Sequence, residues 1–220
     1  MKRSTGSHFC GGSIINSNKI MCAAHCKQSS NNFSAGAGAV SLTAQKQTQR
    51  ISSQLAHPQY NSHLIDYDYM VITTQGTWNY DQYVAPIQIV NPSTSELPNG
   101  TACQTSGYGY SQHIAGQPGV IASTLQWTDI NCITLAECKK VWRTQTLTSR
   151  QQCASTDGVT SCMGDSGGPL TTMEGGVQKL LGNVSWGHSK CSVNGYPSAY
   201  SRNADPTMNQ WIKENANLSY

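Results

Sequence analysis

Short apolar stretches separated by turn-forming residues run along most of the chain. The first two, residues 13–15 and 19–22, flank the turn Asn16-Ser17-Asn18 and predict a β-hairpin. The other stretches of this kind, each predicted to be a strand, are residues 69–73, 84–90, 101–105, 124–132, 179–186 and 199–202. Repeated short strands joined by turns are typical of antiparallel sandwiches and barrels, so the pattern predicts an all-β protein.

Two segments depart from the strand pattern and predict helices. Thr134 and Glu137 form a capping box that opens a helix over residues 134–143. Asp205 and Pro206 are an N-cap and first-turn proline for a C-terminal helix over about residues 206–216, whose apolar face would consist of Met208, Trp211 and Ile212.

A segment rich in proline, serine and asparagine, residues 91–100, separates two strand-rich halves of similar size. We expect one domain over residues 1–220, with a first half over about 1–95 and a second over about 101–204.

The composition and charge of the chain argue against nucleic acids and membranes as partners. Charged residues are only 11% of the chain and the net charge is +3. The cations before the first acid, Asp66, stand singly among polar residues, which argues against a nucleic-acid partner: Lys2, Arg3, Lys19, Lys27, Lys46 and Arg50. No apolar run approaches the eighteen or so residues that span a bilayer, so we expect no membrane segment.

The chain has nine cysteines, and none lies in the paired spacing of a zinc finger. Disulfides are therefore expected, which implies an oxidising compartment and a secreted protein, although the first residues lack the apolar core of a signal peptide. The histidines other than His25 form no ligand cluster in the sequence, so no metal or other cofactor is expected: His8, His57, His63, His113 and His188.

The clearest chemical signal is Ser166, which stands in the glycine-rich run Gly-Asp-Ser-Gly-Gly-Pro over residues 164–169. Glycine-rich turns that contain serine are common in proteins without any catalytic role. A nucleophilic serine also needs a base and a group that orients the base. His25, in Ala-Ala-His-Cys, and Asp68, just before an apolar strand, are the candidates.

The order His25, Asp68, Ser166 resembles that of the trypsin/chymotrypsin family of serine proteases. The resemblance extends over nearly the whole chain from Ser7, through residues 8–13 (His-Phe-Cys-Gly-Gly-Ser), 185–187 (Ser-Trp-Gly), 197–200 (Pro-Ser-Ala-Tyr) and 211–212 (Trp-Ile). It implies a fold of two packed six-stranded antiparallel β-barrels.

The resemblance implies a role for each of these residues. Ser166 would be the nucleophile, His25 the general base and Asp68 the group that orients the imidazole, with Asp66 as the rival for the third role. The main-chain N–H groups of Gly164 and Ser166 would form the oxyanion hole. Ser185 would support Asp68.

Substrate selection would depend on Thr160, which the resemblance places at the floor of the primary pocket. A neutral floor cannot pair with a buried lysine or arginine, so an uncharged residue, aromatic, leucine or methionine, is expected before the scissile bond. Asp157 lies nearby but out of register. The other residues expected to bind substrate are Met163, Ser185, Trp186, Gly187 and Ser198.

The same resemblance implies the disulfides Cys10–Cys26, Cys138–Cys153 and Cys162–Cys191. Cys103 and Cys132, on neighbouring strands, are a fourth candidate pair, and Cys22 is expected to be a buried free thiol.

In the family, a new N-terminus freed by cleavage pairs with the aspartate before the nucleophile, here Asp165. Because few residues precede Cys10, we expect Asp165 to lack this partner, to turn outward and to displace the Gly164 amide, leaving the 220-residue chain zymogen-like and poorly active.

These inferences lead to a secreted, monomeric serine endopeptidase that acts on protein or peptide substrates and is open to protein inhibitors. The alternative is a non-catalytic homologue that uses the barrel surface for binding.

Overall fold

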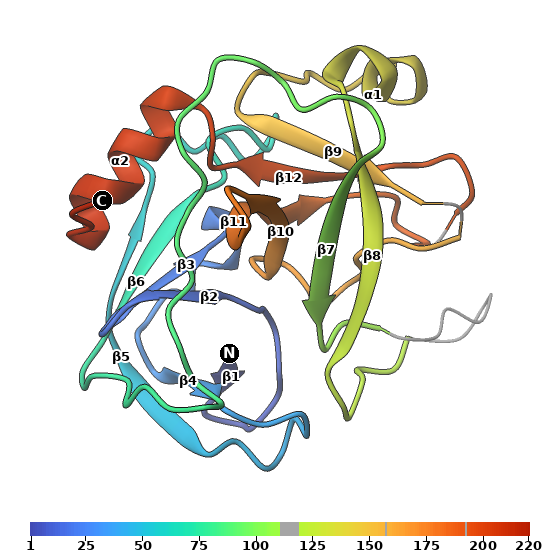
Figure 1. Ribbon diagram of the computed structural model, residues 1–220. Helices are drawn as coiled ribbons and strands as arrows, with labels where there is room; N and C mark the ends of the chain where they lie inside the picture. The colour runs from blue at the N-terminus through green and yellow to red at the C-terminus, as the bar shows by residue number, and fades with distance from the viewer. Residues whose placement is uncertain (111–118, 157, 192) are drawn as a thin grey trace.

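The computed structural model describes residues 1–110, 119–156, 158–191 and 193–220. Two antiparallel sheets lie side by side, with the chain passing from one to the other once (Figure 1).

The first sheet has six strands in the order β1-β4-β5-β6-β3-β2. Their bounds are β1 Lys2–Arg3, β2 Ser13–Asn16, β3 Lys19–Cys22, β4 Phe33–Ala37, β5 Gln47–Ala56 and β6 Met70–Thr74. It forms a half-barrel, because the edge strands β1 and β2 are not paired with each other. Its core includes Ile20, Phe33, Ile51, Ile72 and Trp78.

The second sheet is a closed barrel in the order β10-β11-β12-β9-β8-β7. The strands are β7 Thr101–Gly107, β8 Gln126–Ile133, β9 Gln151–Ser155, β10 Pro169–Glu174, β11 Val177–Trp186 and β12 Ser198–Arg202. Pairing of β10 with β7 closes the ring. Ile130, Leu170, Leu181 and Tyr200 are buried inside it. Two six-stranded antiparallel sheets agree with the expected fold.

Both predicted helices are present. In α1 (Leu135–Val141) the Thr134 side chain accepts a hydrogen bond from the Glu137 N–H, and in α2 (Pro206–Ala216) the Asp205 carboxylate caps the first turn. A short 3₁₀ helix, Ala24–Cys26, follows β3. The buried face of α2 packs against residues of both sheets, Met21, Val71 and Leu180 among them. No helix in the described residues is long and apolar enough to cross a membrane.

The prediction of a strand over residues 84–90 is wrong. This segment runs extended between the two sheets and forms only an isolated bridge, from Ile89 to Leu180. Its apolar residues Val84, Ile89 and Val90 are buried because the segment covers the junction between the sheets, and not because it pairs within one.

The structure contains four disulfides: Cys10–Cys26, Cys103–Cys132, Cys138–Cys153 and Cys162–Cys191. Cys22 is free and buried, and burial raises the pKa of its thiol to about 12. The Cys22 thiol is therefore protonated and unreactive at neutral pH.

Candidate active site

His25 and Asp68 are paired at the surface of the first sheet. His25 lies in the 3₁₀ helix after β3, and Asp68 lies two residues before β6. His25 Nδ1 is 2.7 Å from Asp68 Oδ2, and the His25 main-chain N–H donates to Oδ1 at 2.8 Å. The Ser185 hydroxyl donates to Oδ2 at 2.6 Å, as the resemblance implied. Asp68 is only 2% exposed, so three hydrogen bonds hold a buried carboxylate against the imidazole.

This pairing changes the protonation of His25. Burial lowers the pKa of the imidazole, but the hydrogen bond to Asp68 and the charge of Asp68 together raise it by more than burial lowers it. The net pKa therefore lies above its ordinary value of 6.5. With Nδ1 held by the carboxylate, the other ring nitrogen, Nε2, is the one available to accept a proton.

Ser166 lies in a turn that packs against the disulfide next to His25. The Gly11 N–H donates to the Ser166 carbonyl at 2.8 Å, and Cys26 Sγ lies 3.6 Å from the same oxygen. Gly167 has φ +75°, and a Cβ there would approach Cys22 Sγ to 2.4 Å. The glycine after Ser166 is therefore required by both backbone conformation and space.

The Gly164 and Ser166 N–H groups, expected to form an oxyanion hole, donate no hydrogen bond within the described residues. Gly164 has φ +96°, a conformation that favours glycine. Both donors are thus available to a ligand.

Asp165 points inward, contrary to the expected outward turn. Its carboxylate accepts hydrogen bonds from the main-chain N–H groups of Gly109, at 2.7 Å, and Cys162, at 2.9 Å. These two donors replace part of the lost hydration and hold the side chain in place. Burial nevertheless raises the pKa of Asp165, because these two bonds only partly offset it.

A cavity of about 250 Å³ borders Asp165. Thr160 and Ser161 line the same cavity, together with Gly107, Gly109 and Trp127. Thr160 and Asp165 therefore border the same cavity.

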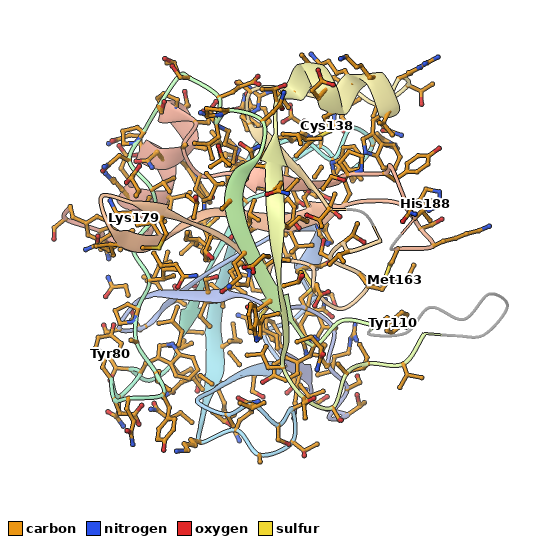
Figure 2. All side chains as sticks on the ribbon, turned by 45° about the vertical axis from the view of Figure 1, so that its right-hand side comes forward. Tyr80, Tyr110, Cys138, Met163, Lys179 and His188 are labelled. Atoms are coloured by element: carbon orange, nitrogen blue, oxygen red, sulfur yellow. A yellow bond between two sulfur atoms is a disulfide. The ribbon has the colours of Figure 1, made fainter. Side chains whose placement is uncertain are left out.

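The remaining residues expected to bind substrate come from β11 and the residue after it, from β12 and from the loop between β9 and β10. A Cβ on Gly187 would lie 3.2 Å from the Ser198 hydroxyl, so these two residues face each other. The Trp186 ring packs edge-on against Trp142. Met163 is 52% exposed, on the same side of the molecule as His188 (Figure 2). Asp157 lies outside the described residues.

Asp66, the rival for the third role, does not contact His25. It forms an ion pair with Arg150, in which the guanidinium Nη2 lies 2.5 Å from Asp66 Oδ2. Sequence reasoning did not single out Arg150, since nothing near it in the chain indicates a partner 84 residues away.

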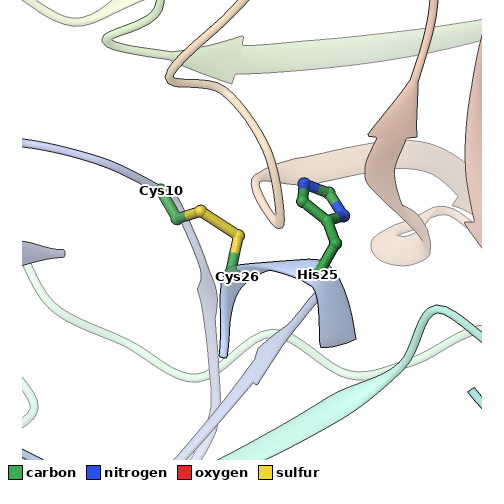
Figure 3. A group of neighbouring side chains, drawn as sticks. All are labelled: Cys10, His25 and Cys26. Atoms are coloured by element: carbon green, nitrogen blue, oxygen red, sulfur yellow. A yellow bond between two sulfur atoms is a disulfide. The ribbon is translucent and has the colours of Figure 1, made fainter. Parts of the chain in front are cut away.

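Cys10, His25 and Cys26 are the one group within the described residues whose ligand atoms are close enough to hold a metal ion. Figure 3 shows that the two sulfur atoms are bonded to each other, with the His25 imidazole to one side. While that disulfide is intact neither sulfur is a thiolate, so the group lacks the ligands of a zinc site. His113 lies outside the described residues.

A half-barrel and a barrel that bring an Asp–His pair, with its carboxylate buried, next to a serine in a glycine-rich turn define the class of two-barrel serine hydrolases. The family model for trypsin matches residues 1–212. The chain is 33% identical to trypsin delta of Drosophila melanogaster over 217 residues, which is 96% of this chain and 80% of the relative. It is 31% identical to trypsin 5G1 of Aedes aegypti over 216 residues, 96% of this chain and 77% of the relative. The chain belongs to the trypsin family of serine proteases.

Proposed function

We propose that this protein is a serine endopeptidase that hydrolyses peptide bonds through an acyl-enzyme on Ser166. The observation that carries the proposal is the His25–Asp68 pair beside a serine whose neighbouring N–H groups are free to donate. Ser166 Oγ attacks the substrate carbonyl while His25 Nε2 takes its proton. The N–H groups of Gly164 and Ser166 stabilise the resulting oxyanion. His25 then protonates the leaving amine. In the second half of the reaction His25 takes a proton from water as the water attacks the acyl group, and it returns this proton to Ser166 Oγ when the acid product leaves.

The proposed substrates carry an uncharged side chain before the scissile bond. The residues proposed to form the primary pocket, Thr160, Gly187 and Ser198, include no acid that could pair with a buried cation. The relatives are named trypsins, but this name describes those proteins.

A panel of peptides that differ only in the residue before the scissile bond tests both the activity and the pocket. We expect phenylalanyl, tyrosyl, leucyl or methionyl peptides to exceed the arginyl peptide in kcat/KM by about 100-fold, because burying an unpaired guanidinium costs about 2 to 3 kcal/mol or more. Preference for arginine would overturn the role given to Thr160. Absence of hydrolysis of every peptide would favour a non-catalytic homologue.

Asp165 is proposed as the partner of an ammonium group that enters the cavity beside it. The carboxylate is partly buried, its pKa is raised, and among the described residues only main-chain N–H groups are hydrogen-bonded to it. An ammonium there would pair with the charge and fix the segment that carries Gly164 and Ser166.

The test compares the 220-residue chain with a form that carries a cleavable leader followed by Ile-Val-Gly-Gly. We expect cleavage of the leader to raise kcat/KM by orders of magnitude, and Asp165→Asn to abolish that increase. Equal activity of the two forms would show that the two main-chain donors suffice to hold Asp165.

Four disulfides also support secretion into an oxidising compartment, and we propose that the enzyme is a monomer open to protein inhibitors.

A further inference from the structure

The proposed catalytic groups come from both halves of the fold. His25 follows β3 and Asp68 precedes β6, both strands of the first sheet, whereas Ser166 precedes β10 and Ser185 lies in β11, both strands of the second. Catalysis therefore depends on contacts that fix the segment around Asp68 against the second barrel. The ion pair between Asp66 and Arg150 is such a contact.

The ion pair is bidentate and mostly buried. Arg150 Nε donates to Asp66 Oδ1 at 2.9 Å, and its NH2 group donates to Oδ2 at 2.5 Å. The Thr148 hydroxyl donates to Oδ1 as well, at 3.2 Å. The side chains of Arg150 and Asp66 are 22% and 9% exposed. A guanidinium and a carboxylate that meet through two parallel hydrogen bonds fix orientation as well as distance.

The backbone on both sides of Asp66 adopts an unusual conformation. Ile65 has φ +49° and Tyr67 has φ +55°, both in the left-handed region that non-glycine residues rarely occupy. Such conformations persist only where surrounding contacts hold them. Here the Gln151 side chain donates to the Ile65 carbonyl at 3.2 Å, and the Arg150 guanidinium lies over the Tyr67 ring, 4.1 Å from its centre. The residues that hold the segment are therefore those just before and at the start of β9.

The same contacts continue to Asp68. The Tyr69 hydroxyl lies 2.8 Å from both the Arg150 and the Arg202 carbonyl oxygens, and the Ser201 hydroxyl donates to the Asp68 carbonyl at 2.7 Å. Tyr69, directly after Asp68, is thus bound to the Arg150 main chain, and Asp66, two positions before Asp68, is bound to the Arg150 side chain.

We propose that Asp66 and Arg150 are positioning residues, whose ion pair across the two halves of the fold sets the Asp68 carboxylate against His25. The proposal rests on the proposed function only for its effect on turnover. Asp66 acts through Asp68 and does not touch the substrate. Burial raises the pKa of Asp66, but the hydrogen bonds from Arg150 and the Tyr67 N–H bring it below its ordinary value, so the ion pair is intact at neutral pH.

The test replaces each partner by a neutral residue of similar size, in Asp66→Asn and Arg150→Met. We expect each change to lower kcat by about 10- to 100-fold with KM within about twofold, since a small misplacement of a catalytic group has costs of this order. Lys179→Met is the matched control, because it breaks a partly buried ion pair, to Glu174, that lies within the second barrel. That control should leave kcat unchanged.

A second readout separates positioning from simple electrostatics and needs no turnover. It is the NMR titration of the His25 imidazole in the Ser166→Ala chain. The two substitutions change the local charge in opposite directions, so charge alone would move the pKa of His25 down in Asp66→Asn and up in Arg150→Met. Misplacement of Asp68 moves it down in both, towards 6.5.

Opposite shifts, or no shift beyond that of Lys179→Met, would overturn the proposal. If one variant fails to fold, Arg150→Lys serves instead: it keeps the charge but loses the second hydrogen bond, and it should lie between wild type and Arg150→Met in both readouts. A downward shift in both variants of a chain that hydrolyses no peptide would leave the positioning role intact and refute the proposed function.

Discussion

Ser166→Ala is expected to lower kcat by about 10⁶-fold, the size of loss seen when the serine of such a catalytic unit is removed. The reason is that without Oγ no acyl-enzyme can form, and the two N–H groups can then act only on direct attack by water. KM should change little because the substrate-binding residues remain. Steady-state hydrolysis of the best peptide of the panel measures both constants.

Ser155→Ala, on β9 and outside the residues assigned to the site, is the matched control and should keep full activity. A Ser166→Ala enzyme that retained a tenth of the wild-type kcat would rule out the acyl-enzyme. His25→Ala in the same background should cost almost nothing further, since residues that act as one unit are not additive.

Asp68→Asn is expected to lower kcat by about 10⁴-fold at neutral pH, the loss typical of this replacement in proteases with such a triad. The amide can donate where the carboxylate only accepts, so it favours the wrong imidazole tautomer. It also removes the charge that raises the pKa of His25. Because the neutral imidazole is the active form, wild-type kcat/KM should fall as pH drops through a midpoint above 6.5, and this midpoint should be lower in Asp68→Asn.

The pH profile of kcat/KM measures this shift. Asp129→Asn, which changes an exposed carboxylate on β8, is the control and should match wild type. A wild-type midpoint well below 6.5 would contradict the His25–Asp68 pairing seen here.

The elements predicted correctly from the sequence are those with a strong local signal. The first hairpin has a polar turn between two apolar runs, and both helices have a capping residue in place. Strands β5 and β9 gave no such signal. Of the ten residues of β5 only Ile51 is fully buried, and β9 opens with Gln151 and Gln152, two buried polar side chains. Their places in the sheets depend on pairing with distant strands.

The candidate site shows the same division. The glycine-rich run around Ser166 and the order of the three residues are visible in the sequence. The choice between Asp66 and Asp68 is less so, because both precede the same apolar strand. Arg150, from the other half of the fold, forms an ion pair with Asp66, and the Ser185 hydroxyl donates a hydrogen bond to Asp68. The inward position of Asp165 depends likewise on main-chain donors that no residue type indicates.

The central claim, that Ser166 is an activated nucleophile, is tested most directly by a fluorophosphonate probe read by peptide mass spectrometry. The probe forms a covalent bond only with a serine whose hydroxyl is activated by a base. The account predicts one adduct per chain, on Ser166, that is absent in Ser166→Ala and forms far more slowly in His25→Ala. An unlabelled Ser166 in correctly processed, folded protein with its four disulfides intact would contradict it.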